Sequence, residues 1–382
     1  MTRWALPLLC LPACVPQGLE GYVVVVDGGV ADGDGLPIGG AAVEVLDDGG
    51  EPVGSATTDA DGSWSWPLYG TEPTGNALSV RVSAPDFATG RARWEVNLLT
   101  SGSAILRAGP GQDWQSVPRG LASVRLDTEA GGLAVRGRIV DPDGVPVSGL
   151  PGIAQAGWDA AVGAPAEASF TTGADGSFSA TVETPGLYTI YVAPIEGWAG
   201  TRFPVLTTPF TDPTVGTIAP LQEPGRLLAA LGWTGPQDLD LHLTAPQRDV
   251  DAANPLQRFH IWADDPVHLD RSGTTTVAEL VRTSTSGPGT EVAQVYTPVG
   301  EGQLRLSVVD RSNEEEEENL ALASSQALLQ WWNGEDLPRY ALVSPLAVAT
   351  VWRPAEVDTR GGTVYAVEQY ESGIDPADDD AF

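Results

Sequence analysis

The residues whose types and spacing could do chemistry lie in the stretch Asp-Leu-Asp-Leu-His, where Asp238, Asp240 and His242 alternate with leucines. In an extended strand, residues two apart share one face at a spacing of about 6.6 Å, so these side chains could converge on a metal ion or another ligand. The other two histidines, His260 and His268, follow closely and could complete such a site if their strands are neighbours. We therefore treat Asp238, Asp240 and His242 as a candidate ligand face.

The same row has a second interpretation, as the polar and solvated face of an ordinary strand that carries a hydrogen-bonded histidine. The spacings of the histidines match no zinc-binding signature, and rows of carboxylates and histidines are common on exposed strands. This is the interpretation that we expect. We therefore assign no metal and no cofactor to the chain.

Other catalytic signatures do not occur in the sequence. It has no G-x-S-x-G elbow, no H-E-x-x-H and no glycine-rich phosphate loop before a helix. The 51 acidic residues are so abundant that any pair of carboxylates is uninformative. The sequence thus predicts a protein that is not an enzyme, with no catalytic residue, and leaves a carboxylate-dependent hydrolase as the weaker alternative.

The elements that must position these residues are strands. Strict alternation of apolar and polar residues in LSVRVS (78–83) and RARWEVNL (91–98) is typical of strands with one buried face. The 45 glycines and 31 prolines are spread along the chain, which suits tight turns between short strands. In the candidate segment, Leu239, Leu241 and Leu243 are predicted to face the core. The pattern predicts an all-β fold of three consecutive antiparallel β-sandwich domains.

Two motifs recur in the same order and indicate a duplicated domain. GLPIGG (35–40) is echoed by GVPVSG (144–149), and TTDADGSWSW (57–66) by TTGADGSFSA (171–180). A chain of 382 residues is too long for one core and should form two to four domains. The predicted domains span residues 20–127, 128–221 and 224–372, followed by an acidic tail at 373–382. Trp64 and Phe178 should occupy equivalent core positions.

The repeated decapeptide could hold a cation or form a turn. Asp59 and Asp61 offer two carboxylates, but the second copy has Gly173 in place of Asp59 and keeps only Asp175. A calcium loop needs six to eight oxygen ligands, which this segment does not supply. Asp-Gly at a tight turn, followed by a core aromatic residue, is the interpretation that we favour.

Gly-x-Pro-x-x-Gly after a first strand, followed by T-D-x-D-G-x-aromatic, resembles the carboxypeptidase regulatory-like, or prealbumin-like, seven-stranded sandwich. The two copies together cover roughly half of the chain. The resemblance implies accessory modules without catalytic residues of their own.

The third domain is similar to the YfaP-like family of unknown function. The residues that carry the resemblance are LGWTGPQDLDLHLTAP, then SGPGTE, and then the strand-like GQLRLSVVD. Here Gly-Pro-Gly-Thr-Glu (287–291) has two residues more than the family's plain Gly-Pro-Glu turn. The resemblance covers residues 224–372 and implies no particular activity.

The first residues predict export. One arginine precedes a short apolar run, as in a secretory leader, and Leu11-Pro12-Ala13-Cys14 resembles the bacterial lipobox. We expect a signal peptide at 1–13 and lipid attachment at Cys14, with the membrane as a partner through that anchor. Both cysteines of the chain lie within these first 14 residues, so no disulfide can brace the rest. An outer-membrane location is expected.

The net charge of −31 excludes nucleic acid as a partner, because phosphate contacts need clusters of Lys and Arg. The sequence predicts a non-enzymatic cell-envelope lipoprotein that presents binding or structural modules to an envelope protein or glycan. The alternative is a carbohydrate- or metal-binding envelope protein. In that alternative Trp331 or Trp332 would form a sugar platform, and only one of the two could do so, because neighbours in a strand face opposite ways.

Overall fold

The structure is a computed structural model, and its described residues are almost entirely strands and turns. The exceptions among them are the short helix α1 (Ala321–Ser324) and a 3-10 turn (Arg311–Asn313), and no described helix is long and apolar enough to cross a membrane. The predicted all-β class, with consecutive sandwiches, is confirmed. The described residues are 21–32, 36–47, 50–70, 76–96, 104–108, 121–125, 133–157, 160–207, 214–223, 225–248, 257–313, 321–343, 349–359 and 364–372.

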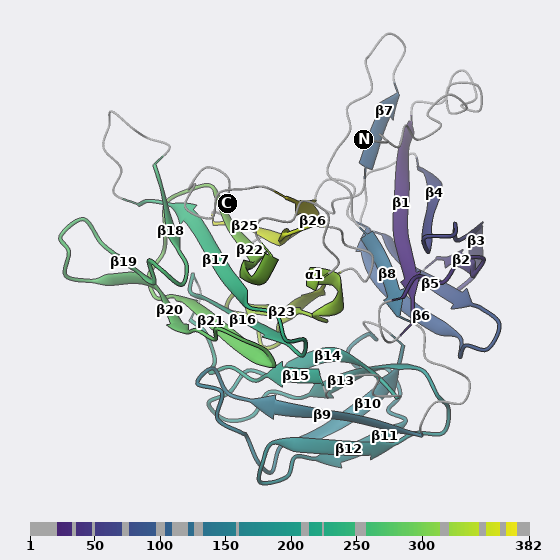
Figure 1. The fold of residues 1–382 in the computed structure, drawn as a ribbon, viewed down its shortest axis with the longest axis horizontal. Helices are drawn as coiled ribbons and strands as arrows, with labels where there is room; N and C mark the ends of the chain where they lie inside the picture. The colour runs from purple at the N-terminus through teal and green to yellow at the C-terminus, as the bar shows by residue number, and fades with distance from the viewer. Residues whose placement is uncertain are drawn as a thin grey trace.

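The first sandwich consists of two four-stranded sheets, drawn in purple to blue in Figure 1. One sheet centres on β1, which pairs with the other three strands: β1 (Gly21–Ala31), β4 (Ser63–Gly70), β7 (Ala104–Ala108) and β8 (Leu121–Arg125). The second sheet has the order β3-β2-β5-β6, with bounds β2 (Ala42–Leu46), β3 (Pro52–Thr57), β5 (Asn76–Ser83) and β6 (Gly90–Val96).

The second sandwich repeats this topology except for β7, which has no counterpart among its described strands. Its sheets have the orders β12-β9-β15 and β11-β10-β13-β14, so β9 takes the place of β1 and β15 that of β8. The β1–β8 and β9–β15 pairs are parallel, a departure from the purely antiparallel prediction that both copies share. The strands are β9 (Ala134–Val140), β10 (Pro151–Ala156), β11 (Ala168–Thr171), β12 (Ser177–Thr181), β13 (Leu187–Val192), β14 (Thr201–Leu206) and β15 (Thr214–Thr217).

The third sandwich is the largest and pairs a six-stranded sheet with a five-stranded one. The six-stranded sheet has the order β19-β20-β21-β16-β23-β24, with bounds β16 (Leu227–Trp233), β19 (Val267–Leu269), β20 (Thr276–Arg282), β21 (Gly289–Val295), β23 (Leu328–Trp332) and β24 (Arg339–Leu342). The five-stranded sheet has the order β18-β17-β22-β25-β26, with bounds β17 (Leu239–Pro246), β18 (Arg258–Ile261), β22 (Gln303–Asp310), β25 (Val351–Asp358) and β26 (Val364–Glu371).

The two recurrent motifs meet in space and form the same turn unit in each copy. Gly62 and Gly176 both have a φ of 75°, and the carbonyl of each accepts a hydrogen bond from the first strand of its sandwich, at Val30 and Ile139 respectively. A threonine precedes the turn in both copies, and its hydroxyl accepts the N–H of Ala41 at Thr58 and that of Leu150 at Thr172. The two recurrent sequence motifs therefore form one turn structure, which occurs in both copies.

The aspartates of this turn unit bind their own chain. Asp61 accepts the hydroxyl of Ser63 at 2.7 Å, and Asp175 accepts that of Ser177 at 2.6 Å. These hydrogen bonds lower the pKa of both carboxyl groups. The position held by Asp59 contributes its backbone N–H and C=O, as Gly173 does in the second copy, so its carboxylate is not needed. The geometry is that of a turn.

A core aromatic residue follows each turn and is paired with a glycine of the neighbouring strand. Trp64 pairs with Gly28 in the β1–β4 ladder, and Phe178 pairs with Gly137 in the β9–β12 ladder. Both aromatic side chains are 4% exposed. Because glycine has no side chain, it leaves room for a large aromatic residue at the paired position. The two residues occupy equivalent buried positions.

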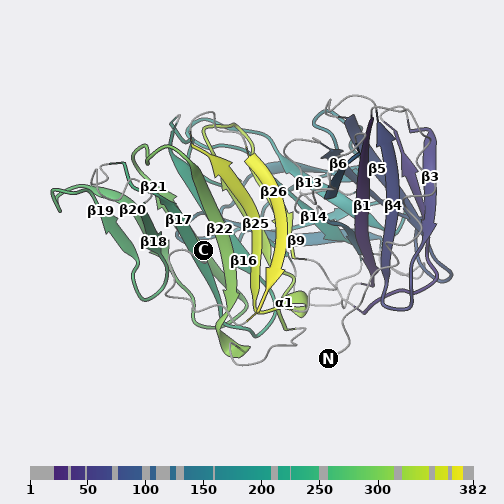
Figure 2. The same cartoon turned by 90° about the horizontal axis from the view of Figure 1, so that it is seen from above.

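The second and third sandwiches share a buried joint. Strand β16 is buried along its whole length, because its two faces pack on different sandwiches. Leu227, Ala229, Leu231 and Trp233 belong to the core of the third sandwich. Leu228 and Ala230 pack with Trp332 against Ala199 and Ala219 of the second. In Figure 1 strands β14 and β15 lie beside β16 and β23, and the second sandwich lies below the first and the third. Figure 2, seen from above, therefore shows parts of it behind them.

Gln330 completes the joint with hydrogen bonds to both sheets of the second sandwich. Its side-chain oxygen accepts the N–H of Thr217 at 2.8 Å, and its amide nitrogen donates to the Thr201 hydroxyl at 2.8 Å. Thr217 ends β15 and Thr201 begins β14, which are edge strands of the two sheets. The third sandwich therefore covers strand edges that would otherwise expose unpaired backbone groups.

Candidate functional site in the third sandwich

The candidate segment forms β17, and its leucines face the core as predicted. Leu239, Leu241 and Leu243 are fully buried between the two sheets. Asp240 and His242 therefore project from the opposite face of the five-stranded sheet, where His242 pairs with Ser307 of β22. The alternation of the sequence was sufficient to place each side chain on its face.

The prediction that this polar row is solvated is wrong. His242 is 0% exposed and Asp240 is 5% exposed, whereas Asp238 at the start of the row is half-buried. The ring of Trp262, just after β18, stacks on His242 with centroids 5.4 Å apart, and the Arg311 guanidinium lies over Trp262 at 5.3 Å. These two side chains, which sequence spacing did not connect with the row, help to cover it.

Two of the three histidines meet and the third does not. His242 Nδ1 and His260 Nε2 lie 2.8 Å apart, so one ring donates an N–H hydrogen bond to the other. Burial, followed by the nearby His260 and Arg311, lowers the pKa of His242 well below its ordinary value. His268 lies elsewhere and stacks on Phe259.

Arg311 links the carboxylates around this pair. Its guanidinium lies 3.6 Å from Asp240 and 3.7 Å from Asp264, and its backbone N–H donates to the carbonyl of Asp238. Among the described residues, no group of three or more His, Cys, Asp or Glu side chains is arranged to hold a metal ion. Because a ligand in solution does not reach the buried His242 ring, the geometry does not favour the candidate ligand face. Ligand binding there stays a prediction.

Glu291 is the residue of this region that the analysis of the sequence did not single out. Its side chain is fully buried and accepts the N–H of Leu241 at 2.6 Å and that of Ser284 at 3.1 Å. Strand β17 pairs with β18 only from Leu243 onward, so the N–H of Leu241 needs this carboxyl group as a partner. Burial, with a smaller contribution from the charges of Asp240 and Asp238, raises the pKa of Glu291 to about 8.

Glu291 is the last residue of the Gly-Pro-Gly-Thr-Glu segment, and this motif was the sequence signal that could have identified it. Gly287 and Gly289 pack against the indole of Trp233, so closely that an added Cβ would lie within 2.5 Å of the ring. The Trp233 nitrogen donates to the carbonyl of Gln237 at 2.8 Å. The separate parts of the YfaP-like motif therefore contact one another at one end of β17.

The tryptophans expected to offer a sugar platform are both buried. Trp331 is 4% exposed and belongs to the core of the third sandwich, and Trp332 is 0% exposed and lies in the joint. The prediction that one of them faces solvent is wrong, because the second sandwich covers the outer face of β23. A glycan surface at these residues is thereby excluded.

No protein-family model matches this chain, and no curated protein matches it. Solved structures to which it is similar include the shaft pilin SpaA from Lactobacillus rhamnosus GG, at 10% identity and a TM-score of 0.18, covering 52% of this chain and 98% of that one. The Bacillus cereus major pilin subunit BcpA has 9% identity and a TM-score of 0.20, covering 76% and 88%. A Streptococcal ancillary pilin has 13% identity and a TM-score of 0.19, covering 74% and 89%.

These likenesses concern the β-sandwich fold alone. Identities of 13% and below, with TM-scores of 0.20 and below, carry no argument about function.

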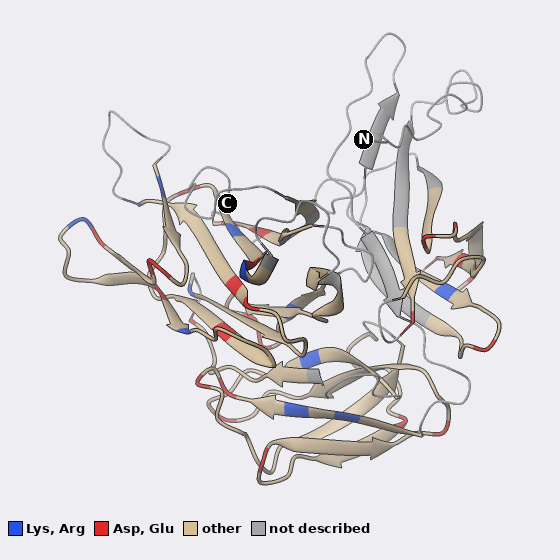
Figure 3. Cartoon of the chain, viewed as in Figure 1, with Lys and Arg blue, Asp and Glu red and all other residues tan. Residues whose placement is uncertain are grey.

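Three predicted features lie outside the described residues, namely the signal peptide at 1–13, Cys14 and the acidic tail at 373–382. In Figure 3 the acidic positions of the described chain lie mainly in turns and at strand ends of all three sandwiches.

Glu291 should make the stability of the protein fall with rising pH. A carboxyl group whose pKa is raised on folding stabilises the folded state below its unfolded pKa, and this contribution is lost as the pH rises toward 8. His242 acts in the opposite sense, since its lowered pKa costs stability only as the pH falls below about 6.5. Between pH 6.5 and 8 the fall in the free energy of unfolding with rising pH should therefore come from Glu291, at up to about 1.4 kcal/mol per pH unit.

Chemical unfolding of the full chain at several pH values in this window measures the slope. Glu291→Gln should flatten it, and Glu335→Gln, the same charge change at a half-exposed side chain, is the matched control. A wild-type stability that rises with pH across the window would contradict the assignment.

Proposed function

We propose that this protein is an exported envelope lipoprotein whose sandwiches act as non-enzymatic structural or binding modules. The leader-like N-terminus and the lipobox-like Leu11-Pro12-Ala13-Cys14 support export and anchoring. The confinement of both cysteines to this segment supports a mature chain that relies on apolar cores and not on disulfides. An outer-membrane location belongs to the same proposal.

The observation that carries the structural role is the joint between the second and third sandwiches. Gln330 hydrogen-bonds to one edge strand of each sheet of the second sandwich, and β16 is apolar and buried on both faces. Interfaces between independently moving domains are more polar, so this one is expected to hold the two modules in a fixed orientation. A stiff pair of sandwiches suits a protein that holds a surface at a set position.

The first two sandwiches are proposed to be carboxypeptidase regulatory-like modules, and the third a YfaP-like one. The support for the first is the turn unit, which has the same hydrogen bonds in both copies. The support for the YfaP-like assignment of the third sandwich is the contact between Trp233 and the Gly287–Gly289 segment. Accessory modules of this kind supply binding surface and spacing, and neither resemblance implies a catalytic role.

Replacing Cys14 tests the anchor. Cys14→Ser should move the protein from the membrane fraction to the soluble fraction of the exporting cell, because stable membrane attachment needs the acyl chains that the cysteine would carry. Cys10→Ser is the matched control, and that variant should remain with the membrane. Mass spectrometry of the mature N-terminus gives an independent readout. An unmodified N-terminus upstream of Cys14 would overturn the lipoprotein proposal.

A further inference from the structure

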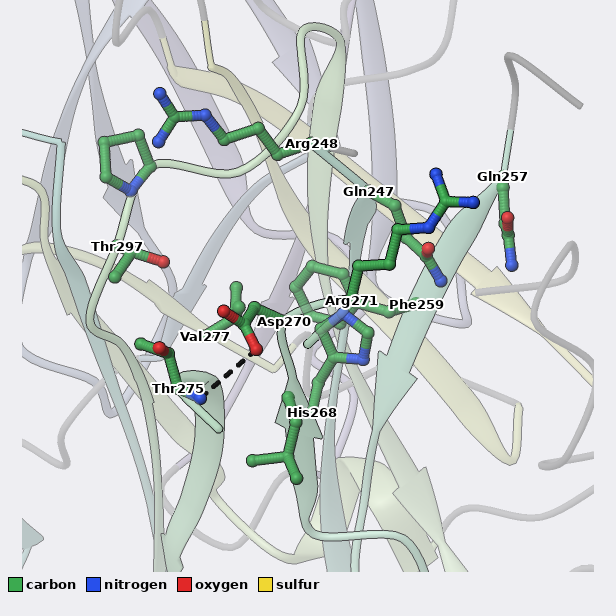
Figure 4. A pocket seen from close by; sticks show the side chains of 12 residues that line it. Gln247, Arg248, Gln257, Phe259, His268, Asp270, Arg271, Thr275, Val277 and Thr297 are labelled. Carbon is green, nitrogen blue, oxygen red and sulfur yellow. Dashed lines mark hydrogen bonds between the residues drawn. The ribbon is translucent and has the colours of Figure 1, made fainter. Parts of the chain in front are cut away.

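A pocket of about 590 Å³ opens at one end of the third sandwich, and neither His242 nor His260 lines it. Its walls come from the end of β17, the start of β18, the β19–β20 turn and the loop after β21, so both sheets contribute. Volumes of this size are typical of sites for small molecules. Figure 4 shows the side chains that line it.

One wall of the pocket is a flat pair of rings. Phe259 and His268 stack with centroids 4.1 Å apart and an angle of 3° between their planes. Phe259 is anchored in the core at 4% exposure, and His268 covers it from β19. Burial lowers the pKa of His268, which favours the neutral form of its ring. A neutral, rigid and planar surface is suited to contact with the apolar face of a ring-shaped ligand.

The pocket carries positive charge in a strongly acidic chain. Arg248 and Arg271 line it, and neither guanidinium forms an ion pair with any carboxylate of the described residues. In Figure 4 Arg248 lies on the side of Thr297, and Arg271 extends toward Gln247 and Gln257. Since guanidinium groups bind carboxylates through paired hydrogen bonds, this lining favours an anionic ligand.

The acidic residue of the lining, Asp270, is already engaged. Its carboxylate accepts the hydroxyl of Ser272 at 2.7 Å and the N–H groups of Thr274 and Thr275 at 3.1 and 3.2 Å. These hydrogen bonds lower its pKa to about 2. Asp270 therefore shapes the β19–β20 turn, and its carboxylate is occupied by groups of that turn.

Amide and hydroxyl groups complete the lining. Gln247 and Gln257 lie side by side because the N–H of Gln247 donates to the carbonyl of Gln257 at 2.9 Å. Thr275 and Thr297 add hydroxyl groups from the other two loops. A ligand with several hydroxyl groups on a ring would find donors and acceptors on more than one side.

We propose that this pocket binds an acidic saccharide, in which a sugar ring stacks on the His268–Phe259 wall, a ring carboxylate pairs with Arg248 or Arg271, and hydroxyl groups bond to the glutamines and threonines. The two observations that select this class are the flat wall and the two guanidinium groups, which form no ion pair with a carboxylate of the described residues. This site is separate from the buried tryptophans on which a glycan surface was expected.

Calorimetric titration of the purified full chain tests the proposal, with a trisaccharide of galacturonic acid as the probe and the neutral galactose trisaccharide beside it. The acidic probe should bind, its affinity should fall as salt rises, and the neutral probe should bind at least tenfold more weakly. Arg271→Gln and Arg248→Gln should each weaken binding about tenfold, and His268→Ala should do so as well.

The control is Arg339→Gln, which removes an arginine from β24 at the opposite edge of the same sheet. It should bind the acidic probe as the wild type does. Arg248 and Arg271 are exposed, so their variants should keep the melting temperature, which is measured in parallel. Equal affinity for both probes, no binding at millimolar concentration, or wild-type affinity in both arginine variants would overturn the proposal. The titration is independent of the anchor at Cys14.

Discussion

Replacing Trp332 with alanine is expected to lower the free energy of unfolding by about 3–5 kcal/mol and to loosen the joint between the second and third sandwiches. The indole is fully buried, packs with Leu228 and Ala230 of β16 and donates to the carbonyl of Gly200 at 3.1 Å. Its removal leaves a cavity and an unpartnered carbonyl group between two sandwiches. Denaturant unfolding, together with limited proteolysis between β15 and β16, measures both effects.

Trp331→Ala is the matched control for the joint, because the neighbouring indole points into the core of the third sandwich. We expect that variant to lose comparable stability but to keep the second sandwich protected until the third unfolds. Trp332→Phe retains most of the buried area and should cost only about 1–2 kcal/mol. A Trp332→Ala loss below about 1 kcal/mol, with unchanged proteolysis, would show that the joint is not the packed interface described above.

Gly176→Ala in the turn unit should destabilise the second sandwich by more than about 3 kcal/mol. The glycine has a φ of 75°, and an added Cβ would lie 2.4 Å from the backbone oxygen of Ile139. That oxygen belongs to the central strand β9, so it cannot move aside as the end of a flexible side chain could. Thermal unfolding of the full chain would report the loss.

Gly149→Ala separates backbone strain from the clash. Gly149 has a φ of 77° in the same turn unit, but an added Cβ there meets nothing within 4 Å. Replacing it with alanine should lower the free energy of unfolding only by the strain of a left-handed backbone at a non-glycine residue, about 1 kcal/mol. Gly62 is the counterpart of Gly176 in the first sandwich. An added Cβ at Gly62 would lie 2.5 Å from the backbone oxygen of Val30, so Gly62→Ala should behave like Gly176→Ala. Similar losses at Gly149 and Gly176 would contradict the clash, and a small loss at Gly62 would contradict the shared role of the turn unit.

Much of the fold could be predicted because the relevant signals are local. Alternation in Leu-Asp-Leu-His-Leu assigns Leu239, Leu241 and Leu243 to the core, since the two faces of a strand differ by one residue in register. The repeated Asp-Gly-Ser followed by an aromatic residue predicted a turn and a buried ring in each copy, and Trp64 and Phe178 have those places. Turn chemistry and strand period act within a few residues of the chain.

The candidate site could be predicted only in part because burial of the polar face is decided by residues far away in the sequence. Nothing near Asp240 or His242 shows that Trp262 and Arg311 cover them, or that His260 is the histidine that meets His242. The position of Glu291 beneath Leu241 depends on where the pairing of β17 with β18 begins. Contacts between sheets follow from topology, which local patterns do not encode.

By itself the sequence determined the all-β class, the duplication, the turn unit and the inward face of β17, because each depends on period-2 alternation or on the φ > 0 that glycine allows. Only the tertiary structure decided what lies against the other face of each strand. Trp332 was equally compatible with a sugar platform until the second sandwich was found packed on β23. The pocket beside Arg248 and Arg271 likewise exists only where three loops from two sheets converge, because a strand's sequence specifies which way a side chain points but not what it meets.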